Sequence, residues 1–186
     1  FCSRCLQPWH LLYLLTSPSA RAHAQARKLK PLGWSFDLLV DLPTLMGLKG
    51  LLEDAAVPLI VDHFGFARAA QGLDQPGFSY LADLVRTGAA YVKISACHRL
   101  SDQAPNYADI IPFARTLIAA NPDRILWGTD WPHPAGSTGA RRPLNEITPY
   151  TEVDDGRILN LLPVWEPDPK IREKILVHNP ARLYRF

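Results

Sequence analysis

The chain has 186 residues, of which 47% are hydrophobic and 20% are charged, and its formal net charge is +2. This composition predicts a globular protein with a sizeable core, without the basic patch that nucleic-acid binding needs or the run of roughly 20 apolar residues that a membrane span needs. Its three cysteines are too few and too scattered for a disulfide framework, which favours a reduced, cytoplasmic setting.

The N-terminal segment, residues 1–18, gives no clear indication of a fold and stays unassigned. Cys2 and Cys5 form one C-x-x-C pair, a weak zinc-binding pattern because no second pair follows it. The apolar run from Trp9 to Leu15, with alanines after it, loosely resembles a secretory signal peptide and leaves export as an alternative to the cytoplasm.

From residue 20 onward, helix-like and strand-like segments alternate. Apolar runs bounded by turn residues predict four strands, and segments with helical spacing or propensity predict the helices around them. The strands are expected at 34–40, 58–63, 91–95 and 124–130, and the helices at 20–30, 42–56, 78–88, 106–122, 156–163 and 168–177. Strands that alternate with helices of this length are typical of parallel βαβ units, so the predicted fold class is α/β.

Polar residues gather where these predicted strands end, at Asp41, His63, Arg99 and Asp130. The carboxyl ends of parallel strands carry the active sites of both open α/β sheets and (β/α)8 barrels. No glycine-rich phosphate-binding loop follows any of the strands, which favours the barrel. Four strand–helix units make only half of such a barrel.

Asp130 stands in the decapeptide ILWGTDWPHP, with Trp127 before it and Trp131 after it. A carboxylate buried beside indole rings has a raised pKa, and a raised pKa suits a general base near neutral pH. The alternative is structural, with Asp130 capping the turn that Pro132 enforces.

Three further residues are candidates for the same site. A functional role for His63 is supported by Asp130, which occupies the corresponding place two strands later. Arg99 offers a planar guanidinium that suits an anionic substrate, or else a surface salt bridge. His98, beside it, points elsewhere if that segment stays extended. His133 lies between two prolines and is either a loop residue or part of the site.

The stretches VDHFG, YVKISACHRLS, RILWGTDWPHP and NPARLYRF resemble the amidohydrolase-related hydrolases, in the branch of the 2-pyrone-4,6-dicarboxylate lactonases and sulfomuconolactone hydrolases. The resemblance implies a distorted (β/α)8 TIM barrel, of which residues 19–186 would be the C-terminal half and the four predicted strands would be strands five to eight. Residues 1–18 fall outside it, which suggests a frameshift or a misplaced start upstream.

The resemblance also implies roles for individual residues. Asp130 would activate the water that attacks a lactone carbonyl, and His63 would stabilise the developing oxyanion. Arg99 would hold a carboxylate of the substrate, with Arg68 and His133 as further substrate-binding candidates. The family's arginine three residues after the strand-six histidine is Phe66 here, so a lactone in general is better supported than a pyrone dicarboxylate.

The family's H-x-H pair does not occur in this sequence, and strands one to four have no counterpart in it. In the family that pair, a further histidine and the aspartate often hold a divalent metal. With only His63 and Asp130 present, we expect no tightly bound metal and no other cofactor.

Two other hypotheses remain open. The chain could be a catalytically inactive half-barrel with an open edge strand at 34–40 and an open apolar interior face, which would oligomerise or bind a partner chain that completes the barrel. Alternatively, Trp127 and Trp131 could form a platform that binds a carbohydrate or an aromatic acid without turnover.

Overall fold

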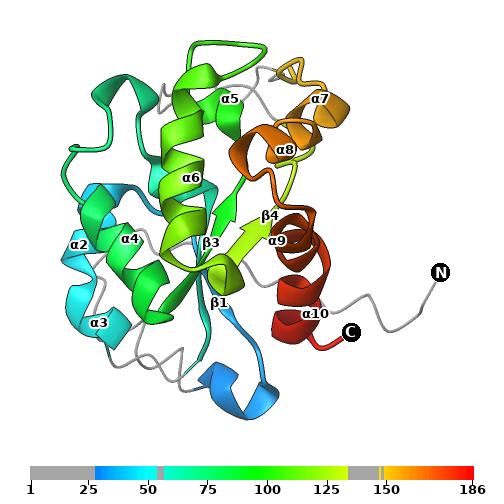
Figure 1. The fold of residues 1–186 in the computed structure, drawn as a ribbon. Helices are drawn as coiled ribbons and strands as arrows, with labels where there is room; N and C mark the ends of the chain where they lie inside the picture. Colours follow the sequence, from blue (N-terminus) through cyan, green and yellow to red (C-terminus); the bar gives the residue numbers. More distant parts are fainter. Residues whose placement is uncertain (1–27, 54–56, 134–146, 148) are drawn as a thin grey trace.

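The computed structural model describes residues 28–53, 57–133, 147 and 149–186, and a four-stranded parallel sheet forms their centre (Figure 1). The strands are β1 (Phe36–Leu38), β2 (Leu59–Val61), β3 (Ala90–Ile94) and β4 (Ile125–Trp127), and each pairs in parallel with the next one in the sequence. The four predicted strands and the parallel α/β class are therefore confirmed. The C-x-x-C pair lies outside the described residues, and so does most of the helix predicted over 20–30.

Helices join consecutive strands, as expected for βαβ units. Between the strands lie α2 (Leu42–Gly47), α3 (Lys49–Glu53), α4 (Phe78–Thr87), α5 (Cys97–Leu100) and α6 (Ile111–Ala120), and after β4 lie α7 (Asp155–Leu159), α8 (Leu162–Trp165), α9 (Pro169–Glu173), the π-helical η6 (Lys174–His178) and α10 (Asn179–Tyr184). Short 3-10 turns complete the connections, at η1 (Lys30–Leu32), η2 (His63–Phe66), η3 (Ala69–Gln71), η4 (Ala108–Ile110) and η5 (Pro122–Arg124). Among the described helices, none is long and apolar enough to cross a membrane.

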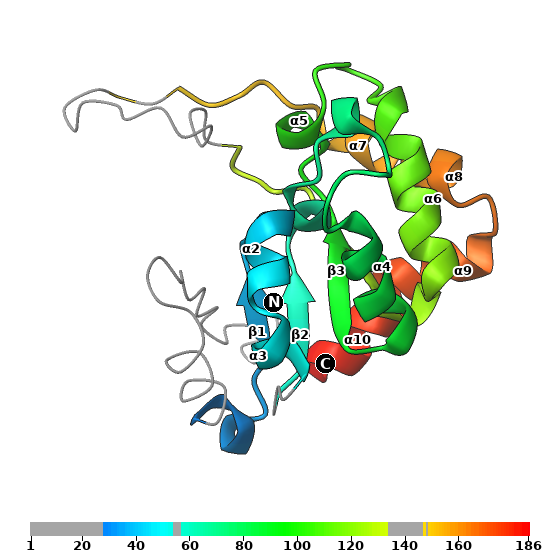
Figure 2. The ribbon, with the colours of Figure 1, turned by 90° about the vertical axis from the view of Figure 1, so that its left-hand side faces the viewer.

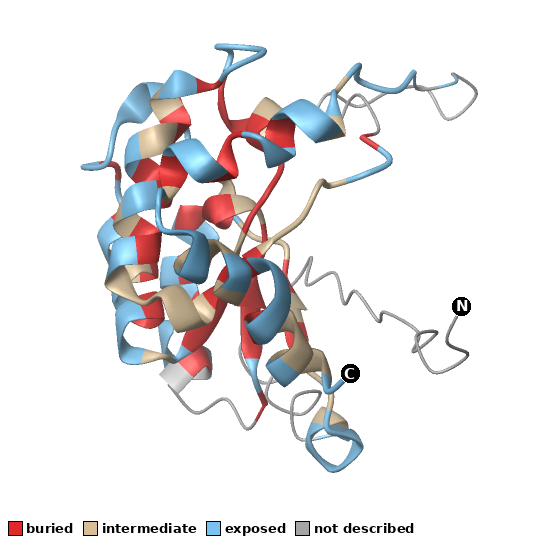
Figure 3. Ribbon diagram, turned by 45° about the vertical axis from the view of Figure 1, so that its right-hand side comes forward, coloured by how far each residue is buried: buried red, intermediate tan, exposed pale blue. Residues whose placement is uncertain are grey.

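The larger core lies between one face of the sheet and helices α2, α4, α6 and α8 (Figure 3). Alternate strand residues point to it, because successive side chains of a strand face opposite sides. Val61, Val92 and Ile125 are fully buried there against Leu81 of α4 and Leu117 of α6. Complete burial of each such side chain contributes about 1.5–3 kcal/mol, so this layer holds the helices on the sheet.

The opposite face of the sheet carries a smaller apolar cluster. Ile60, Tyr91 and Leu126 are buried on it, and Leu183 and Tyr184 of α10 pack against them. The face that the half-barrel hypothesis predicts to be open is therefore partly covered among the described residues. The C-terminal helix folds back over its middle because the cluster offers apolar surface that α10 can cover.

Beside this cluster, an ion network joins three segments of the sheet. Lys93 of β3 places its Nζ 2.6 Å from Oδ2 of Asp37 in β1 and 2.9 Å from Oδ1 of Asp62, directly after β2. Burial acts to lower the pKa of Lys93, but the two carboxylates outweigh it and raise that pKa above its ordinary value. Burial raises the pKa of Tyr184, close to the network, to about 12. This face is thus partly charged.

The end of the chain is held to the sheet by Asn179, which is completely buried. Its Nδ2 donates to the carbonyl oxygens of Pro122, at 2.7 Å, and Ile125, at 2.8 Å. One backbone acceptor in η5 and one at the start of β4 are satisfied in this way. Asn179 therefore has a structural role.

Candidate active site

The carboxyl ends of the strands point to one end of the molecule, where α5 and α7 also lie (Figure 2). The turns that leave the strands there contain several non-glycine residues with positive φ, namely His63 (52°), Ala96 (58°), Asp130 (70°) and His133 (54°). Backbone strain of this kind costs on the order of 1–3 kcal/mol per residue, and it is concentrated at functional sites. These strained residues indicate a candidate functional site at this end of the sheet.

Asp130 is the centre of a cluster of side chains at this end. Its Oδ2 accepts a hydrogen bond from Nε of Arg99 at 2.5 Å, and its Oδ1 lies 3.3 Å from Nε2 of His63. Nε2 of His98 lies 3.6 Å from Oδ2. The structure thus brings together Asp130, His63 and Arg99, the three residues that the sequence analysis put forward as catalytic and substrate-binding candidates.

The surroundings of Asp130 differ from those that its tryptophan neighbours predict. Trp127 packs against the helix-side core, and Trp131 is 74% exposed. The prediction that two indole rings surround the carboxylate is therefore wrong, and so is the prediction that Trp127 and Trp131 form one binding platform. Cationic and imidazole groups surround Asp130 instead, because the turn after β4 directs its side chain toward α5 and η2.

His63 is oriented by Ser95, a residue that the sequence analysis did not find. Oγ of Ser95 lies 2.8 Å from Nδ1 of His63. Because an ionised carboxylate only accepts hydrogen bonds, the ring nitrogen that faces Asp130, Nε2, carries the proton, and the Ser95 hydroxyl donates to Nδ1. Burial lowers the pKa of His63, although Asp130 acts to raise it, so the ring is neutral near pH 7.

His98 reaches the cluster because the segment after β3 is not extended. Ala96 takes a left-handed conformation, and residues Cys97–Leu100 then form the single turn of α5. The expectation that His98 points away from Arg99 is therefore wrong, since both side chains approach Asp130. Burial lowers the pKa of His98 to about 4, which keeps its ring neutral.

His133 also lies at this site and is almost completely buried. Its Nε2 is 2.9 Å from Oδ1 of Asp155, the first residue of α7. Its ring meets that of His98 edge to face, with centroids 5.1 Å apart. Asp154 caps this helix by accepting a hydrogen bond from the backbone N–H of Arg157 at 2.9 Å.

Arg68 lies at the rim of the same cluster. Its side chain is exposed, and Nη1 donates to the carbonyl oxygen of Arg99 at 3.3 Å. Phe66, which stands where the family resemblance implies an arginine, packs its ring edge-on against His63 with centroids 5.3 Å apart. The guanidinium groups of Arg68 and Arg99 are thus associated with one rim, on the side of the site formed by η2 and α5.

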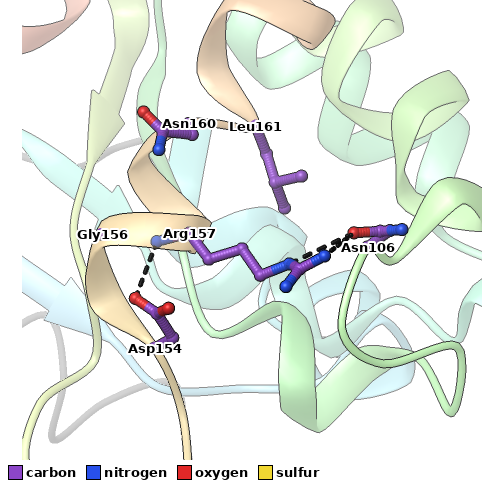
Figure 4. Close-up of a pocket in the computed structure, with 6 residues that line it drawn as sticks. All are labelled: Asn106, Asp154, Gly156, Arg157, Asn160 and Leu161. Atoms are coloured by element: carbon purple, nitrogen blue, oxygen red, sulfur yellow. Dashed lines mark hydrogen bonds between the residues drawn. The ribbon is translucent and has the colours of Figure 1, made fainter.

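An open pocket elsewhere is lined by Asn106 and by residues of α7 and the turn after it (Figure 4). Arg157 donates from Nε and Nη2 to Oδ1 of Asn106, and its backbone N–H is bonded to Asp154. These polar groups already satisfy one another and join α7 to the loop after α5. We therefore assign the pocket a structural role.

Asp41, the polar residue at the end of the first predicted strand, is not part of the site. Asp41, after β1, accepts a hydrogen bond from the backbone N–H of Thr44 at 2.9 Å and caps α2. Hydrogen bonding by the side chain and the backbone of Thr44 lowers the pKa of the Asp41 carboxyl. The candidate site is thus built from the ends of β2, β3 and β4.

Comparison with known proteins gives consistent matches. Residues 9–186 match the family model Amidohydro_2, described as amidohydrolase, so the match begins inside the segment left unassigned above. The 4-sulfomuconolactone hydrolase of Rhizobium radiobacter is 38% identical over 164 residues, which are 88% of this chain and 50% of that protein. The 2-pyrone-4,6-dicarboxylate hydrolase of Comamonas testosteroni is 32% identical over 168 residues, 86% of this chain and 51% of that protein.

A solved structure also matches. The putative 2-pyrone-4,6-dicarboxylic acid hydrolase of Pseudomonas putida superimposes with a TM-score of 0.67 at 26% identity and covers 86% of this chain and 55% of its own. The chain spans about half the length of the curated relatives it matches.

Proposed function

The chain belongs to the amidohydrolase family, whose model it matches over residues 9–186, and from that premise we propose that it hydrolyses a lactone. The observation that carries this proposal is the Asp130 carboxylate, held among His63, His98 and Arg99 at the carboxyl ends of parallel strands. The names of the relatives support a lactone as the substrate class, in line with the resemblance noted in the sequence.

In the proposed reaction, Asp130 acts as the general base. It takes a proton from a water molecule, whose oxygen then bonds to the lactone carbonyl carbon. The carbonyl oxygen becomes negatively charged, and the neutral His63, protonated on Nε2, donates a hydrogen bond to it. The ring C–O bond then breaks, and the departing oxygen receives the proton that Asp130 had taken. The product is an open-chain hydroxy acid or its keto tautomer.

A carboxylate or sulfonate of the substrate would bind at the rim formed by Arg68 and Arg99. A guanidinium offers paired N–H donors that match the geometry of such anions. In the structure, Arg99 neutralises Asp130, so an arriving anion competes with Asp130 for it. Release of Asp130 from this ion pair would free the carboxylate to accept a proton from water.

The substitution Arg99→Met tests this anion site. We expect KM for an anionic lactone to rise about 10- to 100-fold, since a charged hydrogen bond is worth about 1.5–3 kcal/mol. KM for a neutral lactone should change little. Initial rates with 2-pyrone-4,6-dicarboxylate and with an uncharged lactone measure both, and Arg86→Met, which removes an exposed guanidinium of α4, is the matched control. An equal rise in KM for both substrates would contradict the role.

We further propose that β1 to β4 are strands five to eight of a (β/α)8 barrel. Their order and parallel direction agree with that arrangement, and β1 and β4 form the two edges of the sheet. Short edge strands present unpaired backbone groups that other strands can satisfy. A second chain, or a second copy of this one, would complete the barrel there. We place the protein in the cytoplasm, as its cysteine usage predicts.

Ring opening by a completed barrel is the test of this function. The chain is assayed with 2-pyrone-4,6-dicarboxylate and 4-sulfomuconolactone, alone and after co-expression with the half of the Rhizobium radiobacter hydrolase that it does not match. We expect turnover above the buffer rate in fractions where the two chains co-elute. A co-eluting pair that opens neither lactone would overturn the proposal, and the inactive half-barrel would replace it. Turnover by the chain alone would support the function without a partner.

A further inference from the structure

The Asp130 carboxylate also belongs to a second set of side chains, whose two histidines take no part in the proposed reaction. His98, Asp130 and His133 each offer one atom able to bind a metal ion, and these atoms all lie within 4.8 Å of one another. The expectation of no tightly bound metal counted only His63 and Asp130. That count was too low, because α5 and the turn after Asp130 bring two more imidazole rings to the carboxylate.

His133 has the hydrogen bonding of a metal ligand. Its Nε2 lies 2.9 Å from Oδ1 of Asp155, and because an ionised carboxylate only accepts, this nitrogen carries the proton. Nδ1 therefore holds a lone pair. It is buried and, among the described residues, has no hydrogen-bond partner. A buried acceptor left unsatisfied costs about 1–3 kcal/mol, whereas a metal-binding histidine typically donates its other N–H to a carboxylate in this way.

His98 shows the same deficiency. Its Nδ1 is buried and lacks a hydrogen-bond partner within the described part of the chain, and its Nε2 is 3.6 Å from Asp130, too far for a hydrogen bond. The side chains of His98 and His133 are only 8% and 5% exposed. A neutral imidazole keeps a lone pair on whichever ring nitrogen lacks the proton, so His98 too can bind a metal ion. Two buried imidazole rings thus lie next to one carboxylate.

We propose that His98, Asp130 and His133 bind a divalent transition-metal ion such as Zn²⁺, with Asp155 orienting His133. Two imidazole nitrogens and one carboxylate oxygen suit Zn²⁺ and Co²⁺ and leave a fourth position for water. The ligand atoms of a tetrahedral zinc site lie about 3.3 Å apart, so the side chains would have to close by up to about 1.5 Å. The set shares only Asp130 with the H-x-H arrangement that the family resemblance implies.

Arg99 provides a further test of the metal site, because it is a cation that competes for the same carboxylate. Its Nε donates to Oδ2 of Asp130 at 2.5 Å. A metal ion on that carboxylate repels the guanidinium and weakens this bond. Removal of Arg99 should therefore strengthen metal binding, whereas removal of a ligand should weaken it.

Titration of the metal-free chain with Co²⁺, followed by visible absorption and calorimetry, tests the site without any lactone, so its result is independent of the proposed function. We expect one Co²⁺ per chain, displaced by Zn²⁺. His98→Ala and His133→Ala should each weaken binding by more than about 100-fold, Asp155→Asn by about 10- to 100-fold, and Arg99→Met should tighten it. His178→Ala, which removes an exposed histidine, is the control and should change nothing.

Two checks keep the result decisive. Circular dichroism confirms that each variant is folded, and Asp155→Asn, at a partly exposed position, reports on the site if His133→Ala does not fold. The double variant Cys2→Ser/Cys5→Ser removes the C-x-x-C pair. Binding of unchanged affinity in folded His98→Ala and Asp155→Asn, or loss of binding in the double cysteine variant, would overturn the proposal, as would an absence of Co²⁺ binding at millimolar concentration.

Discussion

Asp130→Asn should lower kcat for lactone opening by about 100- to 10,000-fold, the range that a positioned general base contributes. The amide has nearly the shape of the carboxylate but cannot take a proton from water. KM should not rise, because the substrate carboxylate is bound by the arginines at the rim and the amide no longer competes with it for Arg99. Steady-state rates of the co-eluting barrel, measured after chelation and again with added Zn²⁺, give both constants.

Asp83→Asn provides the matched control for this substitution. It makes the same chemical change on α4, where Asp83 forms an exposed ion pair with Arg86, and it should leave kcat unaltered. If Asp130 only tethered Arg99, its loss would free the guanidinium and change KM for anionic lactones more than kcat. Unchanged kcat in Asp130→Asn would remove Asp130 from the chemistry.

The sequence predicts the sheet and the meeting of His63, Arg99 and Asp130 for the same reason. Continuous apolar runs identify buried parallel strands, and polar residues at their ends must lie at one edge once the strands are parallel. The order β1 to β4 follows from short βαβ connections. These features are local in the sequence, or they follow from topology alone.

The position of His98 could not be predicted because it depends on one backbone conformation. Ala96 has a φ of 58°, and an alanine gives no sign in the sequence that it will adopt a left-handed conformation. The helix that follows has only four residues, too few to show periodicity. An extended segment was therefore the natural expectation, and it separated His98 from Arg99.

Other contacts were missed because they join residues far apart in the chain. Ser95 lies 32 residues from His63, and Asp155 lies 22 residues from His133. Neither spacing corresponds to a local motif. The expectation that Trp127 and Trp131 enclose Asp130 was wrong for a related reason, because neighbours in sequence need not share an environment. The strand directs Trp127 toward the helix-side core, while the turn leaves Trp131 in solvent.

Lys93→Met should lower the free energy of unfolding by about 3–5 kcal/mol, the cost of removing one partner from a buried ion pair. Lys93 joins Asp37 and Asp62, whose side chains are 13% and 6% exposed. Without the ammonium group, two carboxylates remain buried beside each other with no cation in this network. Urea unfolding followed by circular dichroism measures the loss.

The loss of stability in Lys93→Met should depend on pH. Burial raises the pKa of Asp37 even with Lys93 present, and without Lys93 it rises further. A carboxylate whose pKa is higher in the folded state destabilises the fold at high pH, and the penalty disappears as pH falls toward the unfolded-state value of about 4. The difference between Lys93→Met and the parent chain should therefore be larger near pH 8 than near pH 5.

Lys174→Met is the matched control, because Lys174 pairs with Asp123 at 3.0 Å on the surface, where the two side chains are 34% and 43% exposed. Its loss should cost no more than about 1 kcal/mol. Equal losses for Lys93 and Lys174, or a larger loss for Lys93→Met at low pH, would contradict the buried network. A large loss confined to Lys93 would mean that this sheet face is already packed and charge-paired within the chain. A partner that completes the barrel would then have to meet the sheet mainly at β1 and β4.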